Sequence, residues 1–460
     1  MNAPSADGPE QRWAGLLARY GGRAPRYTSY PTAAQFTPAV DAATYGAWLE
    51  ALPTDRPVSL YAHIPFCPQL CWYCACNTRA VRRPETIRDY VQLLVSELAL
   101  VERRLPGKLK AQALHLGGGT PNMLSLDDLT TLFKALRHVF RFTPDVEIAA
   151  ELDPAQLTRQ WVRAAGFHGL NRVSLGVQCL SPHVQAAVNR PEPFSVVEQA
   201  VDWLREAGVT SLNFDLMYGL PEQTTADVID TLDQVLTLRP DRLALFGYAH
   251  VPWMKAHQKL IDAAALPGEV ERLAQSEAAA ERLQAAGYVR IGLDHYALAD
   301  DPLAKAALAG RLHRNFQGYT TDQAEILLGF GASAIGKLPQ GYVQNHAVET
   351  AWRQAVSEGV LPTARGVALS EDDRFRADII ERLMCDLCVD LDAACRRHGR
   401  ALADLSEALE DLVRFEADGV IARKGAHIAM TAAGRPFVRA VSAAFDQHLE
   451  RAAPRHSSVV

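Results

Sequence analysis

The sequence predicts an α/β fold in which a partial, TIM-like (β/α)6 barrel lies between an extended N-terminal segment and a mainly helical C-terminal domain. Apolar, strand-like runs alternate with amphipathic helical patterns from residue 58 onward, and strands separated by helices indicate a parallel sheet. Six such units are fewer than the eight that close a TIM barrel. We expect the N-terminal segment at 1–45, the barrel with its extension at 46–364, and the C-terminal domain at 365–460.

Length and composition are those of a globular protein. The 460 residues fit two or three domains, and 48% hydrophobic with 22% charged residues fit a full core. The net charge of −6 argues against broad nucleic-acid binding, which needs a basic face. No apolar run approaches the roughly 18 residues of a membrane helix, and the first residues do not resemble a signal peptide. We therefore expect a cytoplasmic protein whose cysteines are reduced and available to metal.

The N-terminal segment combines one helical pattern with one irregular stretch. Residues 11–20 suit a short helix. The run Ala-Pro-Arg-Tyr-Thr-Ser-Tyr-Pro-Thr at 24–32 has neither a helical nor a strand period. From composition alone, this stretch is expected to be an extended linker packed on the surface.

The barrel elements follow in order. Apolar runs predict strands at 58–64, 111–116, 146–152, 172–177, 211–217 and 242–248. Amphipathic patterns predict helices at 85–105, 125–140, 155–165 and 225–238, with shorter ones from Pro182 and Ser195. Ser125 followed by Asp128 is typical of a helix cap. After the sixth strand, a helix at about 269–286 precedes a further strand at 289–296, and small residues are frequent in 326–335.

The last hundred residues change in character. Helical patterns cover 371–387 and 401–418, a short hairpin is expected at 420–423 and 426–430, and a last helix at 435–449. Helices with one hairpin leave a DNA-binding winged helix as an alternative. The acidic net charge and the absence of a basic stripe favour a structural cap instead.

Unusual residues sit at the ends of the predicted strands. In parallel barrels the chemistry gathers at the carboxyl ends of the strands. The residues at or near these ends are the cysteines that start at Cys67, the run Gly117-Gly118-Gly119-Thr120-Pro121, Glu151, Gln178, Asp215 and the pair Ala249-His250. The pattern predicts one concave mouth that receives all of them.

Four of the eight cysteines lie within ten residues. Cys67, Cys71 and Cys74 have the spacing C-x3-C-x2-C, one ligand short of a four-coordinate zinc site or an ordinary cubane. Three thiolates on a four-iron cluster leave one iron open to a small molecule. A zinc knuckle and merely buried cysteines are the alternatives. Cys76 is expected near the cluster but not as a ligand, because a fourth thiolate would close the open iron.

This spacing resembles the cluster motif of the radical S-adenosylmethionine (SAM) enzymes. In that superfamily the amino and carboxylate groups of SAM chelate the open iron, and one electron from the reduced cluster to the sulfonium releases a 5′-deoxyadenosyl radical. The run Gly117-Gly118-Gly119 resembles a motif that meets SAM, although a glycine run is also compatible with a tight turn. Glu151 and Asp215 are candidates for the ribose hydroxyls or amino group of SAM, or are core acids. Arg190 is a candidate for its carboxylate, or for an ordinary surface ion pair.

Three further stretches narrow the resemblance to one family. They are Pro-Arg-Tyr-Thr-Ser-Tyr-Pro-Thr at 25–32, His-Ile-Pro-Phe-Cys at 63–67 and His-Arg-Asn-Phe-Gln-Gly-Tyr at 313–319. With the fourth cysteine, they resemble the oxygen-independent coproporphyrinogen III oxidases of haem biosynthesis nearly end to end. The resemblance implies oxidative decarboxylation of two propionates of coproporphyrinogen III to vinyl groups, which gives protoporphyrinogen IX.

The resemblance also implies roles for residues, although it identifies no certain catalytic side chain. Cys67, Cys71 and Cys74 would hold a [4Fe-4S] cluster, and two SAM molecules are expected. The first SAM would be lined by Tyr61, Gly118, Glu151 and Ile335, and the second by Tyr73, Gly119, Thr120, Gln178, Arg190, Asp215 and Ala249. The N-terminal segment would reach the active site. The four substrate carboxylates need cations, for which Arg26 and Arg314 are our candidates.

The expected partners are the small-molecule substrate and an electron donor such as flavodoxin or ferredoxin, with no nucleic acid or membrane, and the chain is expected to be a monomer. Two other functions remain as alternatives: a haem-binding chaperone with the same barrel, and a radical SAM enzyme for a different substrate. The fourth cysteine, the loop at 313–321 and the long N-terminus argue against the chaperone. The order of the two decarboxylations, the final electron acceptor, the catalytic status of each SAM site and the role of Cys76 stay open.

Overall fold

The fold is built on one twelve-stranded sheet. The computed structural model describes residues 9–449, so the outer ends of the expected terminal domains, 1–8 and 450–460, lie outside it. Six central strands pair in parallel in the order β1 (Val58–Ile64), β4 (Lys110–Gly118), β5 (Arg141–Leu152), β6 (Arg172–Gln178), β7 (Ser211–Tyr218) and β8 (Arg242–Gly247). These are the six predicted strands, and the partial barrel is confirmed.

The sheet continues beyond these strands at both edges. Beside β1 it adds β13 (Ile326–Phe330), which is parallel to β1, and then the antiparallel β14 (Ile335–Leu338), β15 (Gly341–Asn345) and β16 (Thr363–Ala368). Beside β8 it adds the antiparallel β10 (His295–Leu298) and β9 (Tyr288–Ile291). The single strand predicted at 289–296 is therefore wrong, because the chain turns at Gly292, whose φ of +52° favours glycine.

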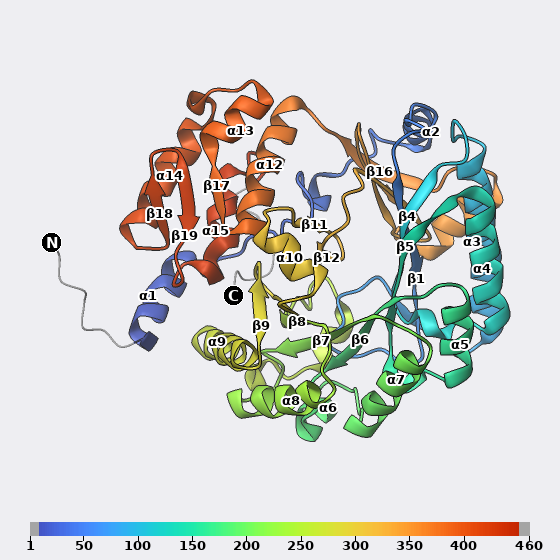
Figure 1. Cartoon of the computed structure of the whole chain (residues 1–460), viewed down its shortest axis with the longest axis horizontal. Coiled ribbons are helices and arrows are strands. Elements are labelled where there is room, and N and C mark those ends of the chain that lie inside the picture. The colour runs from blue at the N-terminus through green and yellow to red at the C-terminus, as the bar shows by residue number, and fades with distance from the viewer. Residues whose placement is uncertain (1–8, 450–460) are drawn as a thin grey trace.

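Helices cover the outer side of the barrel (Figure 1). They are α3 (Pro84–Glu102), α4 (Leu126–Val139), α5 (Arg159–Phe167), α6 (Pro182–Ala187), α7 (Phe194–Glu206), α8 (Thr225–Thr237) and α9 (Glu269–Ala285). Ser125 caps α4 by accepting a hydrogen bond from the amide of Asp128. The helix predicted at 155–165 begins later, because a 3₁₀ turn occupies Pro154–Gln156 and Thr158 caps α5.

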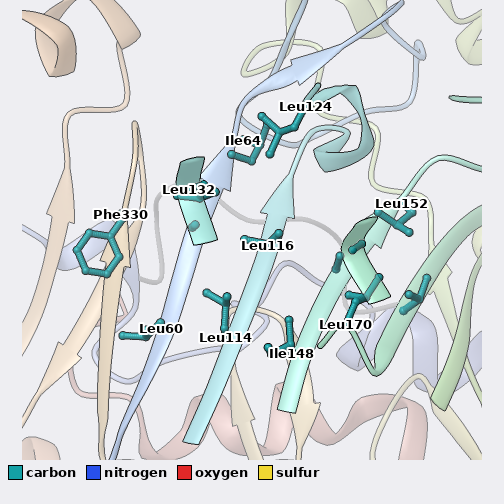
Figure 2. Close-up of a cluster of buried hydrophobic side chains, with 14 of the residues drawn as sticks. Leu60, Ile64, Leu114, Leu116, Leu124, Leu132, Ile148, Leu152, Leu170 and Phe330 are labelled. Atoms are coloured by element: carbon teal, nitrogen blue, oxygen red, sulfur yellow. The ribbon is translucent and has the colours of Figure 1, made fainter. Parts of the chain in front are cut away.

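The main core lies between these helices and the sheet. Figure 2 shows side chains of β1, β4 and β5 gathered in it, among them Leu60, Leu114 and Ile148. Each of these three is at most 1% exposed. Burying one such side chain contributes roughly 1.5–3 kcal/mol, so the apolar runs that predicted the strands also fix them against the helices.

The C-terminal part contains α12 (Glu371–Asp386), α13 (Leu391–His398), α14 (Ser406–Ala417) and α15 (Val438–Ser442), with a small sheet of β17 (Cys388–Asp390), β19 (His427–Met430) and β18 (Ile421–Lys424). The hairpin is confirmed. The continuous helix predicted at 435–449 is wrong, since it is broken into a 3₁₀ turn at Arg435–Phe437, the short α15 and a second 3₁₀ turn at Ala443–Phe445. Pro436, the second residue of the first turn, has no N–H to donate.

The N-terminal segment packs on this C-terminal part. It begins with α1 (Pro9–Tyr20), which lies beside the red C-terminal elements in Figure 1. Tyr20 stacks on Phe415 at a centroid distance of 4.6 Å, and Tyr27 and Tyr30 are each 4% exposed in the same core. The expectation of a surface linker at 24–32 is therefore wrong for its two tyrosines. None of the helices within 9–449 is long and apolar enough to cross a membrane.

Candidate active site

The cysteine loop follows β1 at the carboxyl edge of the sheet. Its start and end are held together by a parallel pairing of β2 (Phe66–Cys67) with β3 (Arg79–Ala80). The loop and the carboxyl ends of the neighbouring strands line a cavity of about 180 Å³, here called the cysteine cavity. Of the fourteen predicted cluster and SAM residues, eleven line it: Cys67, Cys71, Tyr73, Cys74, Gly118, Gly119, Thr120, Glu151, Gln178, Arg190 and Asp215.

Cys76 also lines this cavity. Its hydrogen bond to Cys74 is the largest influence that lowers the pKa of the Cys74 thiol, to about 7. Cys67 contacts two hydroxyls, with Thr78 Oγ1 at 3.1 Å and Thr120 Oγ1 at 3.4 Å from its Sγ. The loop therefore surrounds its thiols with polar partners at the predicted strand ends.

Each glycine of the run 117–119 is needed by a close approach. A Cβ on Gly117 would lie 3.0 Å from the Glu151 carboxylate, and one on Gly118 would lie 2.5 Å from the His63 ring. A Cβ on Gly119 would lie 2.6 Å from the carbonyl oxygen of Phe66. The run is therefore a cradle into which neighbouring groups and backbone fit closely, and Gly118 also has a φ of +111°.

Glu151 is the acceptor at the centre of this cradle. One carboxylate oxygen lies 3.1 Å from His115 Nε2, and the other accepts the Gly118 amide at 2.9 Å. Burial raises the pKa of Glu151, but His115, the Gly118 N–H and His63 outweigh it and hold this pKa below its usual value. Tyr61 stacks on His115, with 6.0 Å between ring centroids. Glu151 is therefore an anion whose hydrogen-bonding donors are already in place.

Arg190 links the cysteine loop to the strand ends. Its guanidinium donates to Cys71 Sγ at 3.5 Å and to Asp153 at 3.3 Å. It also donates to Glu192 at 3.2 Å, and burial raises the pKa of Glu192 to about 8 even though Arg190 opposes this shift. Arg190 Nε is buried without a hydrogen-bond partner among the described residues. The arginine is thus not the surface ion pair that a lone arginine usually forms.

Asp215 lies deeper on β7. It accepts hydrogen bonds from Ser174 Oγ at 2.6 Å and from Asn213 Nδ2 at 2.8 Å. Burial, opposed by these donors and reinforced by the charge of Glu151, raises its pKa to about 6. Two carboxylates therefore line one cavity, and the pKa of Asp215 is raised whereas the pKa of Glu151 is lowered.

The three other predicted SAM residues, Tyr61, Ala249 and Ile335, do not line the cysteine cavity. Tyr61, on β1, is linked to the cavity residue Glu151 by His115 of the neighbouring strand β4. The carbonyl of Ile335 packs against Gly329, since a Cβ added to Gly329 would lie 2.6 Å from the Ile335 oxygen. Gly329 in turn pairs with Tyr61 across β13 and β1. Ala249 lines a second cavity, and its carbonyl is bound by the side chain of Gln258 at 3.3 Å.

The second cavity, of about 400 Å³, is here called the arginine cavity. Its lining comes from the N-terminal segment, β7, β8, α9, β9, β10 and α15. Its charged lining residues are Arg23, Arg26, Arg272, Arg290, Arg439, Glu269 and Asp294, and its aromatic ones are Tyr218, Phe246, Tyr248, Trp253 and Tyr296. Basic side chains therefore outnumber acidic ones in its wall.

Arg290 in this wall is paired with Glu277, whereas burial and repulsion between arginines act against the charge of Arg439. Burial, with repulsion from Arg26 and Arg314, lowers the pKa of Arg439 to about 9. Arg272 donates to the carbonyl of Tyr248 at 2.7 Å, but its Nε has no hydrogen-bond partner among the described residues. Buried cations of this kind stabilise a bound anion, which replaces the water that they have lost.

The two predicted substrate cations have different surroundings. Arg26 lines the arginine cavity and donates to the carbonyl of Gly247 at 3.3 Å. The side chain of Arg314 is only 4% exposed, with Asp294 at 3.9 Å and the ring of Tyr319 at 4.4 Å. Arg272 and Arg439 escaped the sequence analysis. A charged residue inside the apolar run Val438-Arg439-Ala440-Val441 was the available signal for the latter.

The donor set fits the implied cofactors. Within 9–449, no group of three or more His, Cys, Asp or Glu side chains is arranged to hold a single metal ion. Cys67, Cys71 and Cys74 instead border one cavity. The glycine cradle and the preorganised Glu151 adjoin it, as a small polar ligand with amino and hydroxyl groups requires.

Comparisons with known sequences agree along most of the chain. The radical SAM superfamily model matches residues 61–235, and the HemN C-terminal domain model matches residues 369–437. The oxygen-independent coproporphyrinogen III oxidase of Bradyrhizobium diazoefficiens is 48% identical, over 97% of this chain and 100% of that protein. The anaerobic coproporphyrinogen III oxidase 1 of Cereibacter sphaeroides is 42% identical, over 94% of this chain and 96% of that protein.

A solved structure agrees as well. The radical SAM enzyme coproporphyrinogen III oxidase (HemN) of Escherichia coli superposes with a TM-score of 0.88, at 38% identity, over 92% of this chain and 98% of that chain. The cysteine spacing, the open parallel barrel and these matches lead to one conclusion: the chain belongs to the oxygen-independent coproporphyrinogen III oxidase family of radical SAM enzymes.

Proposed function

We propose that this protein oxidatively decarboxylates two propionates of coproporphyrinogen III to vinyl groups and so forms protoporphyrinogen IX without oxygen. The arginine cavity carries this proposal, because a wall with five arginines against two acids suits a substrate with four carboxylates. When bound, the reduced [4Fe-4S] cluster and SAM supply the radical that takes a hydrogen atom from a propionate, after which loss of CO2 and an electron leaves a vinyl group.

The protein's own part is to bind and orient. Cys67, Cys71 and Cys74 hold the cluster, while Tyr61, Gly118, Glu151 and Ile335 line the first SAM. The second SAM is lined by Tyr73, Gly119, Thr120, Gln178, Arg190, Asp215 and Ala249. The place of Ala249 supports its assignment to the second SAM. Ala249 lines the arginine cavity, and the side chain of Gln258 joins its carbonyl to the cysteine loop.

Arg26 is assigned to a substrate carboxylate, and the arginine cavity adds Arg272 and Arg439 as further cations. Arg314 is assigned instead to holding Asp294 within the wall, because it lies 3.9 Å from that carboxylate and does not itself line the arginine cavity. The monomeric state, the cytoplasmic location and flavodoxin or ferredoxin as electron donor stay predictions.

An anaerobic assay tests the proposal. The reconstituted protein is given reductant, SAM and coproporphyrinogen III, and the products are read by mass spectrometry. We expect protoporphyrinogen IX, with loss of two CO2, together with 5′-deoxyadenosine. Both products should be absent for Cys71→Ala and present for Cys388→Ser, a cysteine on β17 in the C-terminal part.

Two outcomes would overturn the proposal. SAM cleavage without decarboxylated porphyrin would mean a radical enzyme for another substrate. Haem binding with no SAM cleavage in the cluster-loaded protein would mean a haem-carrying chaperone.

A further inference from the structure

The chain that leaves β8 runs from the arginine cavity to the cysteine loop. Ala249, His250 and Trp253 line the arginine cavity. Five residues later, Gln258 is 0% exposed and lies against the cysteine loop. We name residues 249–258 the bridging segment, because it lines the arginine cavity at one end and is hydrogen-bonded to the cysteine loop at the other.

Three side chains of the bridging segment hold the cysteine loop by its backbone. The contacts are Lys255 Nζ to Cys76 O at 2.8 Å, His257 Nε2 to Cys74 O at 2.7 Å and Gln258 Nε2 to Tyr73 O at 2.9 Å. All three acceptors are carbonyls, so each side chain is the donor. These carbonyls belong to the third cluster cysteine and to residues within two positions of it.

Gln258 is bound on both sides. Its Nε2 also donates to Ala249 O at 3.3 Å, and its Oε1 accepts from Val251 N at 2.6 Å. One buried amide therefore joins the cysteine loop to the residues that line the arginine cavity. A buried amide with its donors and acceptors satisfied has one favoured orientation, since any other leaves a polar group unpaired.

We propose that Gln258 and His257, assisted by Lys255, are positioning residues that hold Cys74 and Tyr73 in register with the arginine cavity. On the cysteine loop they touch backbone carbonyls only, so they act on the thiols through that loop. The proposal rests on the assigned function only for the position of the substrate. The position of Cys74, the third cluster cysteine, does not depend on which substrate is bound.

Matched variants test the role of Gln258. Gln258→Met keeps the length of the side chain and removes its donor and acceptor, whereas Lys259→Gln changes an exposed neighbour. We read iron and sulfide content and the EPR spectrum of the reduced cluster without substrate. Partners in the outer shell of metal ligands typically affect metal affinity or activity by about 10–100-fold. We expect Gln258→Met to lose cluster or change its EPR spectrum, and Lys259→Gln to match the wild type.

His257 gives a second test that does not depend on a buried site. His257→Leu removes the donor to Cys74 O, and His257→Gln retains one. We expect a changed EPR spectrum for the leucine variant and recovery for the glutamine variant, with thermal midpoints of all cluster-free proteins close together. Wild-type cluster content and spectra in both Gln258→Met and His257→Leu would overturn the proposal. The two proposals can fail separately. If neither the wild type nor the variants act on coproporphyrinogen III but the variants have altered spectra, the assigned function is overturned and the positioning role stands. If none of the proteins acts on coproporphyrinogen III and the variants have wild-type spectra, both are overturned.

Discussion

The imidazole of His115 and the carboxylate of Glu151 meet at 3.1 Å, from neighbouring strands β4 and β5. A carboxylate only accepts hydrogen bonds, so Nε2 of His115 carries the hydrogen. The second oxygen of Glu151 is bound by the amide of Gly118. The carboxylate is thus fixed in direction before any ligand arrives, which is the preorganisation that a binding site requires.

Replacing Glu151 by glutamine should weaken SAM binding. The amide removes the negative charge and presents a donor to groups that themselves donate. A hydrogen bond to a charged group is worth about 1.5–3 kcal/mol, so we expect the Kd of the cluster-loaded protein for SAM to rise about tenfold or more. Glu147→Gln, four residues earlier on β5, is the control. An unchanged Kd for Glu151→Gln would remove this residue from the SAM site.

Gly119→Ala should disrupt the cysteine loop. The added methyl group would lie 2.6 Å from the Phe66 carbonyl oxygen and 2.8 Å from Thr78 Oγ1, and the backbone of β2 cannot rotate away as a side chain does. Overpacking of this kind costs about 1–3 kcal/mol. We expect lower iron content and a lower urea midpoint. Gly107→Ala, which meets no atom within 4 Å, should leave both unchanged or raise stability slightly. Equal behaviour of the two variants would contradict the close fit.

Local patterns predicted the parallel core because each of its strands is a short apolar run bounded by helices. The run at 58–64 has the bounds of β1. The same reasoning did not place β13 beside β1, nor β14 to β16 beyond it, because the order of strands in a sheet depends on pairings between distant segments. The buried tyrosines Tyr27 and Tyr30 were missed for the same reason, since their partners lie in the C-terminal part.

The cysteine cavity was predictable because parallel strands deliver their carboxyl ends to one edge. The arginine cavity was not, because its wall is assembled from regions that are distant in sequence. Arg272 lies on α9 and Arg439 on α15, and neither belongs to a recognisable motif. Their meeting with Arg26 follows from the packing of the N-terminal segment on the C-terminal part, which no local pattern expresses.

Arg272 and Arg314 should differ in what they control. Arg272→Gln removes a cation from the arginine cavity, so we expect KM for coproporphyrinogen III to rise about tenfold, the size of one charge-assisted hydrogen bond. Arg314→Gln removes the cation beside Asp294 and above Tyr319, so we expect a lower thermal midpoint. Arg163→Gln, exposed on α5, is the control for both. Steady-state kinetics and thermal unfolding separate the two effects, and a raised KM for Arg314→Gln at unchanged stability would reverse our assignment of Arg314.

Glu97 should make stability depend on pH near neutrality. It is 1% exposed on α3 and accepts hydrogen bonds from Gly331 N at 2.8 Å, Asn345 Nδ2 at 2.6 Å and Trp352 Nε1 at 3.0 Å. Burial outweighs these donors and raises its pKa from 4.5 to about 7. Between these two values the unfolded chain releases the proton and the folded chain keeps it, so the free energy of unfolding falls as pH rises, and it levels off above pH 7.

The glutamine variant isolates this effect, because it cannot titrate. We expect the wild type, measured relative to Glu97→Gln by urea unfolding of the cluster-free protein, to lose on the order of 3 kcal/mol between pH 4.5 and pH 8. Glu85→Gln, an exposed carboxylate on the same helix, should keep a constant difference from the wild type. A pH-independent difference for Glu97→Gln would mean that the three donors hold the carboxylate ionised throughout. Because Glu97 binds the turn that leads from β13 to Ile335, that result would also make its charge a permanent part of the support for the first SAM site.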